Sequence, residues 1–305
     1  MHLVITDSGL GGLSVCAKLL HLLDEAKISK TDFSKINLKI TYINISPSNE
    51  RGFNDMSKIV EQISTFKKIL KNIDNLFSPD LIFLACGTLS GLLKKIQLNK
   101  KISTKIVDIV PIGNKLLLNS IYENPKSNII IFGTPTTIKS KVFQNQLLNK
   151  GILKERIFSQ SCPKLASKIS NDLKGEEVSI LIKKFVKKSI KHIAPNFSSH
   201  LIVFLACTHY PYRADFFYNS FRLEGYNNLN ILSPNFESAL FLRDSIFKYN
   251  GKTILNSNKI SIKFASPYPI PEQEKKTISK LLYLDSEDTV LALKNEIVTP
   301  ELLKD

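Results

Sequence analysis

Short apolar segments alternate with longer amphipathic ones along most of the chain. The short segments end in turn-forming or polar residues, which is typical of strands buried on both faces of a parallel sheet. The segments that we expect to be strands are 2–6, 38–45, 81–85, 105–110, 128–132, part of 152–160, 201–206, 229–232 and 260–265. The segments that we expect to be helices are 13–27, 56–76, 88–97, 113–122, 138–149, 164–171, 176–193, 212–224, 236–249 and 271–283. This alternation predicts parallel βαβ units and an α/β fold. The last twenty residues are charged, and we expect them to form a loose tail.

One short pattern occurs twice. Residues 81–88 read LIFLACGT and residues 201–209 read LIVFLACTH, so Cys86 and Cys207 follow similar apolar segments. Asp7 precedes Cys86 by 79 residues, and Gly133 precedes Cys207 by 74. Chance similarity between two strands is one explanation, and duplication of a domain is the one that we adopt.

The duplication predicts two pseudosymmetric, doubly wound α/β domains with mainly parallel sheets. We place the first, discontinuous domain at 1–112 plus 218–305 and the second at 113–217. Open α/β sheets bind ligands beyond the carboxyl ends of their strands. We therefore expect Cys86 and Cys207 to face each other across an active-site cleft between the domains.

Composition narrows the class of protein. The chain has 305 residues, of which 43% are apolar, an ordinary globular value, and no apolar stretch reaches the length of about 18 residues that a membrane span needs. We see no signal-peptide pattern at the N-terminus. Four scattered cysteines do not make a disulfide framework, so we expect a cytoplasmic protein without membrane partners.

The formal net charge of +15 comes almost entirely from lysines that are spread along the chain. A nucleic-acid surface is one interpretation. Arginine, which forms bidentate hydrogen bonds with bases and phosphates, is rare here. A compositional bias toward Lys, Asn and Ile explains the charge equally well. We therefore expect no nucleic-acid partner, although a basic surface favours an anionic small substrate.

The two cysteines are the leading candidates for catalysis. A thiol is a suitable proton carrier because neighbouring groups can tune its pKa. One thiolate could remove a proton from a substrate carbon while the other thiol delivers a proton to the opposite face. Asp7 and His209 are the groups that we expect to assist Cys86 and Cys207, respectively. The structural alternatives are buried cysteines, a turn aspartate and a strand-end histidine.

Hydroxyl residues follow several predicted strands and precede helices. Backbone N–H groups at such helix starts bind carboxylates, while the hydroxyls also serve as N-caps. The hydroxyl residues are Ser8, Thr88, Thr134, Thr137 and Thr208.

A zinc site is an alternative interpretation of Cys86, Cys207, His209 and Asp7. The sequence has no CxxC pair and no HExxH helix, so we expect no metal.

Two further features have structural interpretations. The glycines after Ser8 do not complete a dinucleotide fingerprint, because Ser14 takes its third glycine position. Cys16 lies in an apolar helical segment, and Cys162 lies in Ser-Cys-Pro, so we interpret both as structural.

Several motifs together resemble the glutamate racemase family, part of the aspartate/glutamate racemase superfamily. They are 7–12 (DSGLGG), 85–88 (ACGT), 133–138 (GTPTTI) with Ser140, and 207–211 (CTHYP), within a match from residue 5 to about 265. The resemblance implies cofactor-independent, two-base racemisation of glutamate between two cysteines, with the substrate held by the hydroxyls and amides of these turns. It also implies supply of D-glutamate for peptidoglycan, and homodimers occur among such enzymes.

The chain departs from the family's usual motifs at the substrate contacts. Gly87 replaces an asparagine, and the family's Pro-Tyr-Gly loop aligns with 50–52, which places Arg51 and Gly52 at the substrate. A glutamate that the family has after its Cys-Pro segment falls near Ser170. The alternatives that we keep are a racemase of another acidic substrate, such as aspartate, and a non-catalytic dicarboxylate-binding protein.

Overall fold

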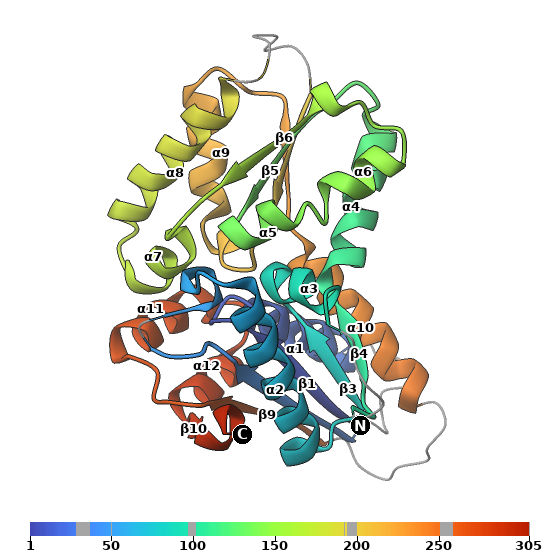
Figure 1. The fold of residues 1–305 in the computed structure, drawn as a ribbon, viewed down its shortest axis with the longest axis vertical. Helices are drawn as coiled ribbons and strands as arrows, with labels where there is room; N and C mark the ends of the chain where they lie inside the picture. Colours follow the sequence, from blue (N-terminus) through green and yellow to red (C-terminus); the bar gives the residue numbers. More distant parts are fainter. Residues whose placement is uncertain are drawn as a thin grey trace. The chain divides into compact units, whose positions relative to one another are not determined.

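The computed structural model describes residues 1–28, 37–49, 51–96, 102–191, 193, 200–250 and 259–304 (Figure 1). The chain divides into two compact units, each with its own sheet. The first unit comprises Met1–Ile109 and Asn235–Asp305, and the second comprises Val110–Pro234. The strands within both sheets pair in parallel, as the alternating sequence pattern predicted.

The first unit contains a six-stranded sheet of order β10-β9-β2-β1-β3-β4. Its strands are β1 (His2–Asp7), β2 (Asn37–Asn44), β3 (Leu81–Leu84), β4 (Lys105–Asp108), β9 (Lys259–Ser266) and β10 (Ile297–Val298). Its helices are α1 (Leu13–Ile28), η1 (Phe53–Asp55), α2 (Ile59–Phe77), α3 (Gly87–Leu93), α10 (Pro234–Asn250), α11 (Glu272–Leu282), α12 (Glu287–Lys294) and η4 (Pro300–Leu303).

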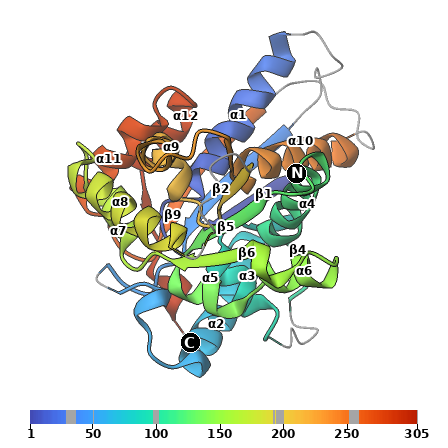
Figure 2. The ribbon, with the colours of Figure 1, turned by 90° about the horizontal axis from the view of Figure 1, so that it is seen from above.

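Helices cover both faces of this sheet, so the unit is doubly wound. Helix α1 contacts α11 and α12, whereas α2 contacts α3 and η4. Figure 2 shows α1 and α12 on one side of β1 and β2, with α2 on the other. The strands are buried because apolar side chains meet helices on each face; Val4 and Ile82, for example, belong to the cluster that packs against α2.

The second unit contains a four-stranded sheet of order β6-β5-β7-β8. Its strands are β5 (Asn128–Gly133), β6 (Ile157–Ser161), β7 (Leu201–Leu205) and β8 (Leu229–Leu232). Its helices are α4 (Ile109–Glu123), α5 (Pro135–Ser140), α6 (Gln144–Asn149), η2 (Lys154–Arg156), α7 (Leu165–Asn171), α8 (Glu176–Ile190), η3 (Tyr210–Arg213) and α9 (Ala214–Leu223). None of the helices in the described part of the chain is both long and apolar enough to cross a membrane.

The two sheets repeat one strand order. Four strands of the first sheet run β2-β1-β3-β4, and those of the second run β6-β5-β7-β8, so each unit's first strand lies between its second and third. The N–H of Ala85 donates to the carbonyl of Thr6 at 2.9 Å, and the N–H of Ala206 donates to that of Phe132 at 2.8 Å. These hydrogen bonds place a cysteine at the same point of each unit, one residue after the donor.

Two sequence-based expectations need correction. Residues 218–234, which we assigned to the first domain, lie in the second unit because β8 pairs with β7 there. The expected loose C-terminal tail is wrong, because residues 287–303 form α12, β10 and η4. Charged residues are frequent in this segment, but apolar side chains between them, such as Leu293 and Leu302, are fully buried.

Leu302 should contribute strongly to the stability of the first unit. It is fully buried in the cluster around α2, and the Asn72 amide on that helix donates to its carbonyl at 3.1 Å. We expect Leu302→Ala to lower the free energy of unfolding by about 2–5 kcal/mol, measured by urea denaturation. Leu284, whose side chain is 92% exposed, is the matched control, and Leu284→Ala should change stability by less than about 0.5 kcal/mol. Equal effects of the two substitutions would contradict the structure.

Candidate active site

The first unit gathers Asp7, Ser8 and Cys86 into what we call the first thiol cluster. Asp7 ends β1, and Cys86 follows β3, the strand paired beside it. The Ser8 hydroxyl lies 3.1 Å from the Cys86 sulfur and donates to Asp7 Oδ1 at 3.5 Å. The hydroxyl therefore lies between the thiol and the carboxylate and can pass a proton between them.

The environment of Cys86 keeps its thiol protonated. Burial, followed by the negative charge of Asp7, raises the pKa of the Cys86 thiol to about 12, and the hydrogen bond from Ser8 opposes both effects. The side chain is 6% exposed. Thiolate formation therefore requires a group that takes the proton or a positive charge that enters the site.

The turn after β1 is packed tightly around Asp7. A Cβ atom at Gly12 would lie 2.9 Å from Asp7 Oδ2 and 3.0 Å from Ala85 Cβ, so only glycine leaves room for the carboxylate. The hydroxyl of Tyr42, on the neighbouring strand β2, donates to the carbonyl of Gly9 at 2.6 Å. The DSGLGG motif is therefore a packing requirement of the first thiol cluster as well as a turn.

Gly87 and Thr88 form the first turn of α3, directly after Cys86. Thr88 is 1% exposed, and the Cys86 carbonyl accepts the N–H of Ser90 at 2.9 Å. Arg51 and Gly52 lie in a separate loop of the same unit, before η1. The Arg51 side chain is exposed and makes no ion pair with any residue that the structure describes, and Glu50 of the same motif lies outside those residues.

The second unit holds Cys207 and His209 beyond the end of β7. The Cys207 sulfur lies 3.9 Å from His209 Nδ1, and both side chains are 8% exposed. Thr208 between them is also buried. The imidazole is thus placed to accept a proton from the thiol or to return one.

Thr134 and Thr137 begin α5 at the end of β5. The Thr134 hydroxyl accepts the N–H of Thr137 at 3.3 Å and donates to its hydroxyl at 3.0 Å, with Pro135 at the first helical position. Thr134 is therefore the N-cap of α5, as the structural interpretation of the sequence allowed, whereas Thr137 lies inside the helix. Gly133 stands where the first unit has Asp7, and a Cβ atom there would lie 2.9 Å from Ile138 Cδ1.

Sequence reasoning missed Tyr210, and it interpreted Cys162 as structural. The fully buried Tyr210 hydroxyl donates to the Cys162 carbonyl at 3.3 Å, and burial raises the pKa of Tyr210 well above its usual value. We call Cys207, His209, Tyr210 and Cys162 the second thiol cluster. The one signal in the sequence is that Leu89, which lies three residues after Cys86 as Tyr210 does after Cys207, is apolar. Ser170, in α7, is 3% exposed.

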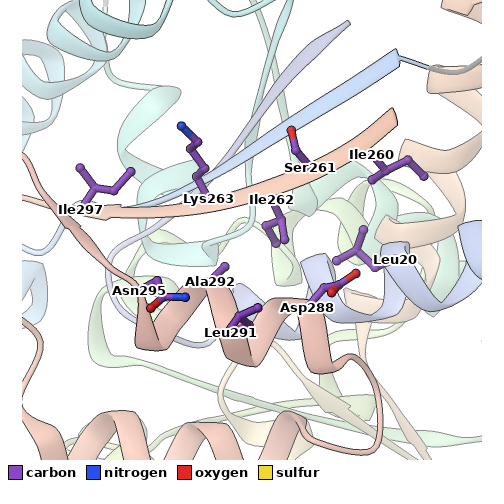
Figure 3. Close-up of a pocket in the computed structure, with 10 residues that line it drawn as sticks. All are labelled: Leu20, Ile260, Ser261, Ile262, Lys263, Asp288, Leu291, Ala292, Asn295 and Ile297. Carbon is purple, nitrogen blue, oxygen red and sulfur yellow. The ribbon is translucent and has the colours of Figure 1, made fainter. Parts of the chain in front are cut away.

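A pocket of about 400 Å³ lies elsewhere in the first unit, between β9 and α12 (Figure 3). Figure 3 shows Ile262 pointing from β9 toward α12, where Leu291 and Ala292 complete an apolar wall. No residue of either thiol cluster lines this pocket. Within the described ranges, no group of three or more His, Cys, Asp or Glu side chains is arranged to hold a metal ion.

Comparison with known proteins connects this fold and these motifs to one class. No family model matches the chain. The chain is 30% identical over 213 residues to a glutamate racemase of Aliarcobacter butzleri, which covers 69% of this chain and 72% of that protein. It is also 30% identical over 209 residues to a glutamate racemase of Clostridium botulinum, covering 68% and 70%, respectively.

The fold is similar to that of solved racemases. A glutamate racemase isoform of Bacillus anthracis superposes with a TM-score of 0.70 at 20% identity, covering 99% of this chain and 98% of that one. The enzyme of Francisella tularensis, solved with D-glutamate, gives 0.66 at 18% identity, covering 97% and 96%. The chain therefore has the two-domain α/β fold of these amino-acid racemase structures. By its sequence it belongs to the glutamate racemase family, and it is an isomerase.

Proposed function

We propose that the protein interconverts L- and D-glutamate by proton transfer between Cys86 and Cys207, without a cofactor. The observation that carries the proposal is the repeated placement of a buried thiol after the third strand of each unit. Each thiol has a polar neighbour that can exchange its proton, Ser8 with Asp7 in one unit and His209 in the other. In the proposed enzyme the two thiols lie on opposite faces of the substrate Cα atom.

The proposed reaction begins with one thiolate and one thiol. The thiolate takes the Cα proton of one enantiomer, and the thiol on the opposite face donates its proton to the resulting carbanion. The two sulfurs thereby exchange protonation states, and the reverse reaction uses them in the opposite order. Asp7 accepts the proton of Cys86 through Ser8, and His209 accepts that of Cys207.

The carbanion has no cofactor to delocalise its charge in this scheme, so fixed hydrogen-bond donors must stabilise it. The proposed donors are the hydroxyls and amides of the turns that follow the strands. They are Ser8, Gly52, Gly87, Thr88, Thr134, Thr137 and Thr208. The exposed guanidinium of Arg51 adds a charge that suits the side-chain carboxylate of an acidic substrate.

The ligands bound in similar solved structures support glutamate as the substrate. The Francisella tularensis structure contains D-glutamate, and an Escherichia coli glutamate racemase structure contains L-glutamate. We further propose that the enzyme works in the cytoplasm as a source of D-glutamate for peptidoglycan, and hence for cell-wall formation and cell shape. A homodimer is compatible with this role. Aspartate is the alternative substrate, because Gly87 and Arg51 change the expected contacts.

Proton NMR in heavy water tests the proposal. Purified protein and L-glutamate, with no added cofactor, should lose the Cα proton signal, and chiral chromatography should then find D-glutamate. Loss of the signal without inversion would mean that one thiol alone exchanges protons. Absence of exchange with glutamate, aspartate and other amino acids would favour a non-catalytic dicarboxylate-binding protein.

A further inference from the structure

Tyr210 connects two strand ends of the second unit. Its N–H donates to the carbonyl of Cys207 at 3.0 Å, directly after β7, and its hydroxyl donates to the carbonyl of Cys162 at 3.3 Å, directly after β6. The N–H of Cys162 in turn donates to the carbonyl of Gly133, which ends β5, at 2.9 Å. The fully buried Tyr210 side chain thus links the Cys207 loop to the end of β6, which is bonded in turn to the end of β5.

The Tyr210 hydroxyl lies close enough to both thiols of its cluster to interact with them electrostatically. Burial, followed by the neighbouring Cys162 and Cys207, raises the pKa of Tyr210, so the hydroxyl stays neutral and keeps its proton. Burial likewise raises the pKa of the Cys162 thiol, although its hydrogen bond with Tyr210 opposes this effect. The tyrosine therefore keeps the proton that it donates to the Cys162 carbonyl at every working pH.

The backbone hydrogen bonds show which residue of the first unit corresponds to Cys162. The N–H of Ile45 donates to the carbonyl of Asp7 at 2.9 Å, as the N–H of Cys162 does to that of Gly133. Ile45 is therefore the counterpart of Cys162, and Asp7 is the counterpart of Gly133.

The counterpart of Tyr210 is Leu89, because each lies three residues after its cysteine. Leu89 and Ile45 are buried together with Cys86 in one apolar cluster. The first thiol thus has hydrocarbon side chains at the two positions where the second thiol has a hydroxyl and another thiol. The two halves of the sequence therefore differ both at the Leu89/Tyr210 position and at the Ile45/Cys162 position.

We propose that Tyr210 is a positioning residue for Cys207: its hydroxyl anchors the Cys207 loop to the Cys162 carbonyl and thereby holds the Cys207 thiol beside His209. The second cluster needs such a group because Gly133 has no side chain where the first has Asp7. The inference rests on the proposed function, in which Cys207 alternates between thiol and thiolate. It assigns to the tyrosine of the CTHYP segment a role distinct from that of His209.

The test is the pH dependence of alkylation at each cysteine in the full-length protein. Tyr210→Phe and the wild type are treated with iodoacetamide between pH 7 and pH 10, and mass spectrometry follows Cys207 and Cys86 separately. We expect Tyr210→Phe to slow alkylation of Cys207 at pH 8 about tenfold, because a Cys207 loop that is released from Cys162 no longer holds the thiol beside His209, the group that takes its proton. Alkylation of Cys86 should change less than about twofold.

Two variants make the result decisive. Tyr218→Phe, which removes a hydroxyl from the partly exposed face of α9, is the matched control and should leave both cysteines unchanged. Fluorotyrosine at position 210 keeps the ring and strengthens the donor, so it should speed alkylation of Cys207, and it tests the inference even where Tyr210→Phe does not fold. An unchanged Cys207 profile in a folded variant would overturn the inference.

Turnover provides a second readout. Tyr210→Phe should lower kcat/KM about tenfold and by the same factor in both directions, because the two enantiomers have equal free energies. A merely structural role would lower turnover without shifting the pH profile of Cys207. Alkylation needs no catalysis, so a wild type without racemase activity would refute the proposed function and still leave the Cys207 measurement to decide the role of Tyr210.

Discussion

Replacing Cys86 with serine should lower glutamate racemisation at least about 10³-fold in both directions, and Cys207→Ser should do the same. Either substitution leaves one side of the substrate without a thiol. A serine hydroxyl has a far higher pKa than a thiol, so it is a poor base at neutral pH. Because racemisation needs removal on one face and delivery on the other, the remaining cysteine cannot complete the reaction. Chiral chromatography of reactions started from each enantiomer measures the loss.

The two single variants should differ from each other in one respect. A glutamate analogue with a leaving group at Cβ needs only one base for elimination, so each variant should eliminate from one enantiomer and not from the other. The preferred enantiomer should be opposite in Cys86→Ser and Cys207→Ser. Cys16→Ser is the control thiol, buried in α1 away from either cluster's contacts, and a folded Cys16→Ser protein should keep its activity. Full racemisation by Cys86→Ser would refute the two-thiol mechanism.

Sequence alone was sufficient for the elements that rest on strong patterns. The parallel α/β class, the duplicated strand–cysteine segments and the positions of Asp7, Ser8 and Cys86 follow from apolar periodicity and turn chemistry, and the structure places these three residues together. Such patterns are visible because each depends on the spacing of apolar and turn-forming residues within a short segment, and parallel strands then bring their carboxyl ends to one edge of the sheet.

Long-range packing was less predictable. The C-terminal segment is rich in polar residues, yet Leu302 is fully buried. Its side chain packs into the apolar cluster around α2, and its carbonyl accepts a hydrogen bond from the Asn72 amide. Tyr210 was similarly hidden, since its partner Cys162 lies 48 residues away and their contact depends on the order of β5, β6 and β7. A periodicity argument cannot find such a pair, because nothing in either local sequence specifies the other.

Replacing Asp7 with asparagine should change two properties of Cys86 in opposite directions. The Asp7 charge raises the pKa of the Cys86 thiol, so its removal should lower that pKa and speed alkylation by iodoacetamide at pH 8 roughly tenfold. Racemisation should nevertheless fall about 10²–10³-fold, because asparagine cannot take the thiol proton that Ser8 relays. A more reactive thiol in a less active enzyme is the result that a proton-accepting role for Asp7 requires.

Ser8→Ala is the matched control, because it removes the hydrogen bond that lowers the pKa of Cys86. Its Cys86 should be alkylated more slowly than that of the wild type, whereas the Cys86 of Asp7→Asn should be alkylated faster. The pH dependence has a definite sign. The thiol is neutral below its raised pKa, so alkylation of wild-type Cys86 should keep rising from pH 8 toward pH 12, and in Asp7→Asn the rise should begin at a lower pH. If Asp7→Asn slowed both alkylation and racemisation, Asp7 would be holding the shape of the turn around Gly12 instead of exchanging a proton with Cys86.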